Sequence, residues 1–340
     1  MHSHPYQKER NFQDLFEEGI GELVLRDKYH EFLDAIAKFH SYSERNIMLI
    51  HKQMPEATMV ATFDTWKGLG RSIIYGEKSR IKIIVPVASK PKKVRRQKED
   101  GITGEPVIDE NGKVVFETVT VQDEPKFSPV AVFDISQTHG EPVMKIAENF
   151  AHDINLYDAF AECLKEISDV PIILEELKVK EGQPQQHEQI LVDAGMGRSR
   201  TLAAMVHEIS RMKLRMQYGE DDKAGTEAQA QALAYVVCKK FGLDTDCNPF
   251  GYFNWNNDIE KIKADIKNIK INAGLFIALL EEKFISLCKK RGIEPMTTVT
   301  GREESDKLTE PQSTVQDEVY LEPQRRYNAS FPAAPHMPPL

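Results

Sequence analysis

Residues 79–87 read SRIKIIVPV, a stretch in which apolar side chains alternate with others as they do in a β-strand that buries one face. A second stretch, KFSPVAVFDI at residues 126–135, is rich in β-branched and aromatic residues, which favour strands. We predict that this second strand returns beside the first. A sheet is therefore expected as the framework of the first half of the chain.

Residues 88–125, which separate these two strands, are polar and rich in Lys, Glu, Asp and Gly. They contain the dipeptide Asn111-Gly112, and Asn-Gly between strand-like segments is a strong signal for a hairpin turn. We predict an exposed β-hairpin over about residues 88–125, inserted into the sheet.

Helical patterns precede the sheet. Apolar residues between positions 12 and 40 recur at steps of three and four, which indicates one or two amphipathic helices. Ser43 is a suitable N-cap for a further helix over residues 44–53, which Pro55 ends. Residues 57–63 (ATMVATF) are β-rich, and residues 65–69 favour a single helical turn between them and the strand at 79–87.

After a turn and a predicted domain boundary near residue 145, the pattern becomes mainly helical. Thr226 is expected to cap a helix that Gly242 ends, and Asp258 to cap a long helix that runs to about residue 291. The other elements expected here are helices over residues 154–168 and 199–216, with short strands at 172–174 and 189–192 between them.

The fold class predicted is α+β in two domains. A helix-plus-sheet domain covers residues 10–145, and a mainly helical domain covers residues 150–292. Residues 293–340 turn to Thr, Glu, Gln, Ser and Pro, with too little apolar content to offset the entropy of ordering. We predict that they form a disordered tail.

Composition excludes several classes of protein. With 340 residues, 41% hydrophobic and 29% charged, the chain has enough apolar material for real cores. It contains no apolar run near the roughly 20 residues of a membrane helix, and its start lacks the order of a secretory signal. We expect a cytoplasmic protein without a membrane partner. Its four cysteines show no CxxC pairing, so we expect reduced thiols and no cysteine–zinc site.

Charge is unevenly distributed along the chain. The net charge is −9, yet residues 26–98 hold 16 Lys and Arg against 7 Asp and Glu. Part of this excess comes from KPKKVRRQK at residues 90–98, for which a solvated loop and a binding segment are both open interpretations. Without that run, residues 26–89 still hold 10 basic against 7 acidic residues. A basic segment inside an acidic chain favours a nucleic-acid partner.

The second half contains His207-Glu208 followed by Arg211, or HExxR, which is one residue away from the zinc motif HExxH. In that motif two histidines one helical turn apart bind one zinc ion, while the glutamate acts on the bound water. Arginine is always protonated and has no lone pair to give to a metal. Taken alone, a helical His-Glu pair is more often an ordinary surface pair than a metal site.

Longer stretches resemble ArdC-type (LtrC-like) antirestriction proteins of conjugative elements. Those of the second half resemble the family's metallopeptidase domain, and those of the first half its single-stranded-DNA-binding domain. The stretches are residues 42–86 and 130–142 in the first half, and 190–196, 201–215, 227–245 and 250–262 in the second. The resemblance covers about residues 10–290 and implies an N-terminal DNA-binding domain followed by a zincin-like domain.

The departures from this family fall on the metal ligands. By the resemblance, His207 is the first zinc ligand and Glu208 the general base, but Arg211 takes the place of the second histidine. When EAQAQALAY is aligned with the family's EVEAESVAY, Gln229 takes the place of the third ligand, and Glu227 lies some 200° around the helix from it. We expect Arg211 to pair with Glu208, and one histidine not to hold zinc.

The first half offers the residues that single-stranded DNA requires, namely cations for phosphates and flat rings for stacking. For Trp66, packing in the core is the slightly stronger interpretation, and for Tyr42 it is an alternative. Lys78 lies in Gly76-Glu77-Lys78, which is most simply a turn. The candidate cations are Arg45, Lys67, Arg71, Lys78, Arg80 and Lys82, and the candidate stacking rings are Tyr42, Trp66 and Tyr75.

We therefore expect a single-stranded DNA-binding, antirestriction-like protein of a mobile element or phage, with an inactive metallopeptidase-like domain. We expect no cofactor; zinc is the metal that the site would take if it were metallated. One rival is an active zinc peptidase with ligands recruited from elsewhere, such as His187 or Asp193. A second is an interaction protein whose basic segment contacts protein or RNA. Metal content distinguishes the zinc peptidase from the DNA-binding protein that we expect. Salt-dependent binding of an oligonucleotide distinguishes the DNA-binding protein from the interaction protein.

Overall fold

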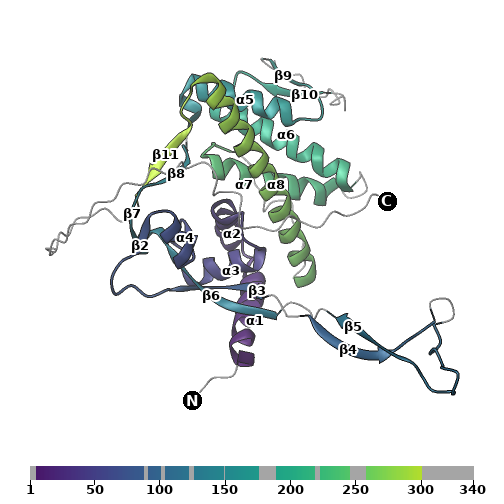
Figure 1. Cartoon of the computed structure of the whole chain (residues 1–340). Coiled ribbons are helices and arrows are strands. Elements are labelled where there is room, and N and C mark those ends of the chain that lie inside the picture. Colours follow the sequence, from purple (N-terminus) through teal and green to yellow (C-terminus); the bar gives the residue numbers. More distant parts are fainter. Residues whose placement is uncertain are drawn as a thin grey trace. The chain divides into compact units, whose positions relative to one another are not determined.

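The N-terminal part of the chain is built on a three-stranded antiparallel sheet in the order β1–β6–β3 (Figure 1). The predicted strands pair with each other, since β3 (Ile81–Val87) runs beside β6 (Lys126–Asp134) from Ile81↔Val132 to Val87↔Lys126. The third strand, β1 (Val60–Ala61), pairs with the end of β6. This computed structural model describes residues 5–87, 91–100, 104–121, 126–148, 150–175, 189–218, 223–245 and 258–300.

Three helices precede the sheet: α1 (Pro5–Glu22), α2 (Arg26–Phe39) and α3 (Glu44–Gln53). Ser43 caps α3 as predicted, because its hydroxyl accepts the N–H of Asn46. The buried Asn46 amide then pairs with both backbone groups of Ile84, each at 2.9 Å. This pair fixes α3 to β3 and leaves no backbone group of Ile84 unsatisfied.

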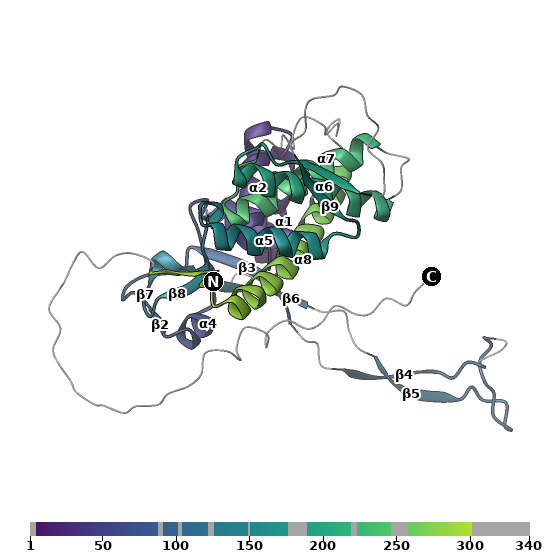
Figure 2. The same ribbon diagram turned by 90° about the horizontal axis from the view of Figure 1, so that it is seen from above.

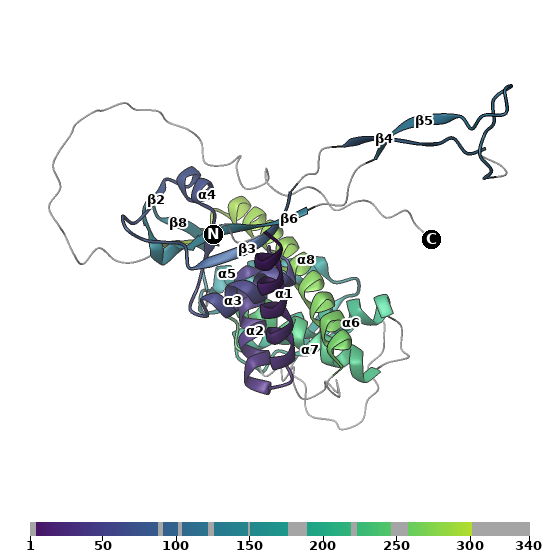
Figure 3. The same cartoon turned by 90° about the horizontal axis from the view of Figure 1, so that it is seen from below.

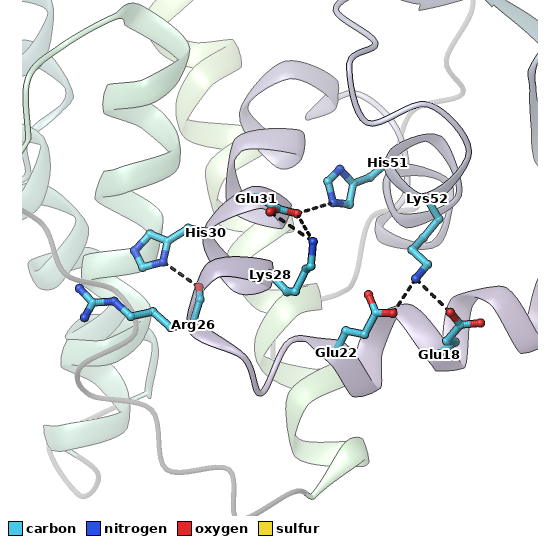
Figure 4. Close-up of polar contacts among 8 residues, drawn as sticks. All are labelled: Glu18, Glu22, Arg26, Lys28, His30, Glu31, His51 and Lys52. Carbon is cyan, nitrogen blue, oxygen red and sulfur yellow. Dashed lines mark hydrogen bonds and ion pairs between the residues drawn. The ribbon is translucent and has the colours of Figure 1, made fainter.

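Ion pairs connect the three helices with one another (Figure 4). Lys52 of α3 contacts Glu22 at 2.8 Å and Glu18 at 3.2 Å, both on α1. His51 of α3 lies 3.7 Å from Glu31 of α2, and burial lowers the pKa of His51. The pair with Glu22 is partly buried and the pair with Glu18 is exposed, so we expect only the Glu22 pair to contribute more than the few tenths of a kcal/mol of a fully exposed pair.

The predicted hairpin is confirmed as a two-stranded ribbon of β4 (Lys92–Gln97) and β5 (Phe116–Val121). At its turn Asp109 accepts the backbone N–H groups of Asn111 and Lys113, each at 2.9 Å. Gly112 adopts φ 76°, which favours glycine. The basic run is therefore mainly a strand and not the solvated loop considered above.

A second small sheet pairs β2 (Arg71–Ile73) with β7 (Thr138–Gly140). The single helical turn predicted before it is α4 (Phe63–Gly68), capped by Thr62. Gly140 must remain glycine, because a Cβ there would meet the carbonyl oxygen of Gly70 at 2.4 Å. The two chain segments of this sheet therefore approach more closely than a side chain would allow.

Segment 133–138 (FDISQT) connects the three-stranded sheet, the β2–β7 pair and helix α4. The buried Asp134 carboxylate accepts three backbone N–H groups, those of Thr58, Met59 and Ser136. Asp134 and Gln137 also form a capping box around the short 3₁₀ helix η1 (Ile135–Gln137). One buried carboxylate thus holds the start of β1 against the end of β6.

The remainder of the chain is mainly helical (Figure 2). Strands β9 and β10 form a parallel pair, and β11 pairs antiparallel with β8. Gly292 ends the last helix in the left-handed conformation at φ 67°. The elements are β8 (Val143–Ile146), η2 (Phe150–His152), α5 (Ile154–Ile167), β9 (Ile172–Glu175), β10 (Ile190–Asp193), α6 (Arg198–Tyr218), α7 (Lys223–Phe241), α8 (Ile259–Arg291) and β11 (Met296–Val299).

Two predictions made for this part were wrong. Thr226 does not cap α7, because the helix begins at Lys223 and Thr226 is buried inside it. The tail does not begin at residue 293, because Met296–Val299 is held in β11 by its pairing with β8. Residues 301–340 of the predicted tail lie outside the described residues.

Residues from both sides of the predicted boundary near residue 145 contribute to one continuous hydrophobic core. Helices α2 and α7 are in contact, and the Tyr235 hydroxyl donates to Asp34 at 2.9 Å. Lys239 adds an ion pair to the same carboxylate at 3.2 Å. The α+β class is confirmed, and the exact division into domains stays a prediction.

Within the described ranges, no helix is both long enough and apolar enough to cross a membrane.

We predict that Asp134→Ala lowers the free energy of unfolding by about 2–4 kcal/mol, because three buried backbone donors lose a charged acceptor. Urea denaturation followed by circular dichroism measures this loss. The matched control is Asp109→Ala, which also removes a carboxylate from two backbone donors but at an exposed turn, and should cost less than about 1 kcal/mol. Equal losses in both variants would contradict the anchoring role of Asp134.

Candidate functional site

The loop between β2 and β3, residues 74–80, is held in place by the buried Gln137. Its amide Nε2 donates to the carboxylate of Glu77 at 3.0 Å and to the carbonyl of Lys78 at 2.9 Å. Ser79 adds hydrogen bonds to the carbonyls of Ile81 and Val132. These hydrogen bonds therefore fix the conformation of the loop.

Tyr75 stands at the tip of this loop and is fully exposed. The N–H of Glu77 donates to the carbonyl of Ile74 at 3.0 Å, which closes a turn with Tyr75 and Gly76 at its centre. Gly76 has φ 85°, as the third residue of a type II turn requires. Both faces of the Tyr75 ring are therefore open to a ligand.

Helix α4 presents a second aromatic ring and a cation beside β2. Trp66 points inward and is fully buried, with its indole N–H donating to the carbonyl of Phe133 at 2.8 Å. Helix α4 also exposes Phe63 and Lys67, which lie one helical turn apart. Trp66 therefore packs in the core, as the stronger sequence interpretation held, and Phe63 was not among the predicted stacking rings.

We use the name Tyr75 corner for exposed residues of helix α4 and of the loop that follows β2, the two elements that flank this strand in the chain (Figure 1). Helix α4 contacts β2, and the loop continues directly from β2. Neither Lys67 nor Lys78 has a carboxylate partner within the described part of the chain, whereas Arg80 lies 3.5 Å from Glu77. The corner consists of the exposed residues Phe63, Lys67, Tyr75, Lys78 and Arg80.

Two of the other predicted DNA contacts are not free to stack or to bind phosphate. Arg71 is buried, and its guanidinium donates to the hydroxyl and the carbonyl of Thr138 at 2.8 and 3.1 Å. Tyr42 is half-buried and donates its hydroxyl to the carbonyl of Val60, while burial raises its pKa to about 12. Both residues hold the framework together in this structure.

Arg45 and Lys82 are exposed but face other grooves. The Arg45 guanidinium lies 5.3 Å from the ring centroid of Phe16, in a groove that Glu17 and Glu260 also line. Lys82 lines a groove between α1 and the sheet together with Asp14 and Glu18. These two cations therefore line grooves that do not include residues of the Tyr75 corner.

The HExxR motif lies on α6, which packs against α7 (Figure 3). Arg211 forms the predicted ion pair with Glu208. The imidazole of His207 lies between two carboxylates, with Nδ1 at 3.5 Å from Glu208 and Nε2 at 3.3 Å from Glu227. Two positive and two negative groups are therefore paired at this site.

The pairing shifts the proton equilibria of all three titrating groups. Burial lowers the pKa of His207, but hydrogen bonds with Glu208 and Glu227 outweigh it and raise the pKa to about 9. The hydrogen bond with His207 in turn lowers the pKa of Glu227 to about 2. Burial raises the pKa of Glu208, yet His207 and Arg211 together bring it below its ordinary value. His207 is therefore protonated at neutral pH in this arrangement.

The expectation that Gln229 stands at the third ligand position needs correction. Gln229 points away from His207 and donates to Asp265 of α8 at 2.9 Å. The residue that faces His207 is Glu227, which also accepts a hydrogen bond from Gln231 at 3.0 Å. Residues 227 and 231 share one face of α7, and residue 229 lies on the other side of the helix. Glu227, and not Gln229, is therefore the residue of α7 that stands at the ligand position beside His207.

The donor set at this site does not fit a zinc ion. His207 and Glu227 offer two donors, and Arg211 places a cation at the position of the missing histidine. No group of three His, Cys, Asp or Glu that could hold a metal ion occurs among the residues that the structure describes. Of the ligands considered as replacements, Asp193 accepts the N–H of Gly195 at 2.8 Å, and His187 lies outside the described residues.

Comparison with known proteins identifies the N-terminal part. Residues 23–121 match the sequence model for the N-terminal domain of the anti-restriction factor ArdC, which confirms the predicted family for this part of the chain. An uncharacterized protein of Bacillus anthracis, pXO2-81, is 26% identical over 293 residues, which are 77% of this chain and 49% of the relative. The chain thus spans about half the length of that relative.

The crystal structure of the antirestriction protein ArdC from the R388 plasmid, in its Mn(II)-bound form, shows a more distant likeness. The similarity covers 72% of this chain and 85% of that one, at 16% identity and a TM-score of 0.39.

We predict that His207 titrates near pH 9 in the folded protein and that Glu227→Gln lowers this pKa, because the variant loses the carboxylate that stabilises the imidazolium. Nuclear magnetic resonance of the imidazole C–H groups across a pH series measures both values. Since the folded pKa exceeds the ordinary 6.5, the stabilisation from His207 is fully present below about pH 6.5 and is lost as pH rises through 9.

The control for this titration is Asp244→Asn, which removes a carboxylate from the same cavity of about 220 Å³ without touching the two pairs. It should leave the pKa of His207 unchanged. A wild-type His207 that titrates at or below pH 6.5 would contradict the paired arrangement.

Proposed function

We propose, from the premise that residues 23–121 form an ArdC-type N-terminal domain, that this chain binds single-stranded DNA through the Tyr75 corner. Single strands are bound without a sequence code when cations contact phosphates and aromatic rings stack on bases. The observation that carries the proposal is the fully exposed Tyr75 ring on a loop fixed by Gln137, with Lys78 beside it.

The corner is suited to a polyanion because two of its three cations are not neutralised, while the third, Arg80, lies 3.5 Å from Glu77. Lys67 and Lys78 have no carboxylate partner within the described part of the chain, and the one carboxylate of the loop, Glu77, accepts a hydrogen bond from Gln137. A fixed loop also lowers the entropy that is lost when a ligand orders it. Binding at the corner should therefore depend on salt and be tolerant of base sequence.

We further propose an antirestriction role, in which the chain protects single-stranded DNA of a mobile element against host restriction or a nuclease defence. The support is the match of residues 23–121 to the N-terminal domain of the anti-restriction factor ArdC. The antirestriction protein ArdC of the R388 plasmid is a distant structural relative. Cytoplasmic location follows from this role as part of the same proposal.

For the second half, we propose a zincin-like scaffold that does not act as a peptidase. Its support is chemical, since Arg211 has no lone pair and pairs with Glu208, the residue that would act as general base. The rival, an active zinc peptidase, gains one observation from the structure, because Glu227 is a carboxylate in place beside His207. A single substitution, Arg211→His, would therefore complete a set of three zinc ligands with His207 and Glu227.

We predict that the full chain binds a labelled single-stranded oligonucleotide, with about −0.7 in the slope of log affinity against log salt for each phosphate contacted. Tyr75→Ala should weaken binding about 5- to 150-fold, the equivalent of a stacking loss of roughly 1–3 kcal/mol. Lys78→Gln should reduce the salt slope by about 0.7 for every base sequence. Fluorescence anisotropy at several salt concentrations measures all three effects.

Lys82→Gln is the matched control, because it removes the same charge from a groove that Asp14 and Glu18 line. It should change neither the affinity nor the salt slope. A wild-type chain that fails to bind at low salt would refute the proposal, and an equal loss in Lys78→Gln and Lys82→Gln would remove the Tyr75 corner from it.

We predict that Arg211→His alone creates a zinc site, because it adds a histidine one turn from His207 while Glu227 already faces that residue. Competition with a colorimetric zinc chelator measures the affinity. Arg211→Gln, which removes the cation without supplying an imidazole, is the control and should bind no zinc. Adding Gln229→Glu to Arg211→His should not tighten binding, since residue 229 faces Asp265.

Stoichiometric zinc in the unmodified chain, with peptide cleavage that Glu208→Gln abolishes, would contradict the inactive site and establish the rival function.

A further inference from the structure

The β4–β5 ribbon has two chemically different faces. Residues directly opposite each other in an antiparallel pair point to the same face, and side chains alternate along each strand. One face, which we call the Lys93 face, carries Lys93, Arg95 and Gln97 with Phe116, Thr118 and Thr120. The opposite face carries Lys92, Val94 and Arg96 with Glu117 and Val119.

The Lys93 face holds cations without a carboxylate. The Arg95 guanidinium lies 4.8 Å from the ring centroid of Phe116, which orients it on the face. Neither Lys93 nor Arg95 has a carboxylate partner in the described segments, whereas on the opposite face Arg96 pairs with Glu117 at 3.0 Å. Thr118 and Thr120 are exposed beside the cations and add hydroxyl groups that bind phosphate oxygens.

Charge also changes along the ribbon. Beyond the paired strands, the tip is mainly acidic, with Glu99, Asp100, Glu105, Asp109 and Glu110 against Lys98 and Lys113. A polyanion is therefore attracted to the paired part and repelled from the tip. Lysines on an open ribbon also prevent edge-to-edge pairing with other strands. Protection of the edges does not explain, however, why the Lys93 face of the paired strands carries no carboxylate.

We propose that the Lys93 face of the β4–β5 ribbon binds the phosphate backbone of double-stranded DNA. Phe116 is the one aromatic ring on this face of the paired strands, and Arg95 lies over one side of it, so the face offers mainly charge and little ring surface on which unpaired bases could stack. The major groove of B-form DNA, about 12 Å wide, admits a two-stranded ribbon, whereas the major groove of A-form RNA is too narrow for side chains to enter.

The ribbon starts close to the sheet of the N-terminal domain. Strand β4 begins at residue 92 and β3 ends at residue 87, so the connecting chain spans at most about 18 Å. Duplex DNA on the ribbon would thus lie near the domain that holds the Tyr75 corner. The inference rests on the proposed function for DNA as the partner, and it adds a duplex-binding surface to the single-strand site.

The test uses the full chain with two labelled DNAs, a blunt duplex and a single strand of equal length, in anisotropy titrations at several salt concentrations. Lys93→Gln with Arg95→Gln removes two cations from the Lys93 face. Lys92→Gln with Arg96→Gln removes the same charge from the opposite face and is the matched control. Lys93→Arg with Arg95→Lys exchanges the cations and keeps the charge.

For the duplex, the first double variant should reduce the salt slope by about 1.8, which corresponds to two phosphate contacts. The control pair and the charge-exchange pair should retain the wild-type slope, and single-strand affinity should be unchanged in all three. All three variants alter exposed residues of the same ribbon, so a folding defect would appear in the control pair as well.

Equal loss in the first and control pairs, a loss confined to the single strand, or a wild-type chain that does not bind the duplex would each overturn the inference. The proposed function is judged separately, by whether the wild-type chain binds the single strand.

Discussion

Four residues of segment 133–138 anchor the N-terminal domain through hydrogen bonds. The carbonyl of Phe133 accepts from Trp66 of α4, and Asp134 accepts three backbone N–H groups around β1 and η1. Gln137 fixes the loop that carries Tyr75, and Thr138 accepts from the buried Arg71. Buried polar groups are costly unless they are paired, so these contacts form as a set or the local fold is lost. The position of the proposed DNA-binding surface depends on this set.

The elements of the fold could be predicted from sequence where a local signal dominates. Asn111-Gly112 marks the hairpin turn, Ser43 caps α3, and Asp258 caps α8. The sequence favoured a buried Trp66 only slightly and did not show that Tyr75 is fully exposed, because the exposure of a ring depends on which distant segments pack against it. The start of α7 was misplaced for a similar reason, since a buried threonine inside a helix and a capping threonine share the same local pattern.

The candidate site of the second half shows how much depends on helical phase. A shift of two residues turns a position by about 200°, so the choice between Gln229 and Glu227 decides whether a carboxylate faces His207. The sequence identifies the change from histidine to arginine, and the structure shows which carboxylates balance the positive charge at this site. Arg211 and His207 are cations that pair with Glu208 and Glu227, so the charges remain balanced without a metal ion. The separation of charge on the ribbon is likewise visible only once the register of β4 and β5 is known.

Hydrogen–deuterium exchange of the full chain, with and without a single-stranded oligonucleotide, locates the bound strand without any substitution. If the strand binds at the Tyr75 corner, exchange slows within residues 63–80, which include α4 and the loop of Tyr75. Exchange along α6 and α7 around His207 should not change. Protection confined to α6 and α7, with residues 63–80 unaffected, would show that the Tyr75 corner is not the binding surface.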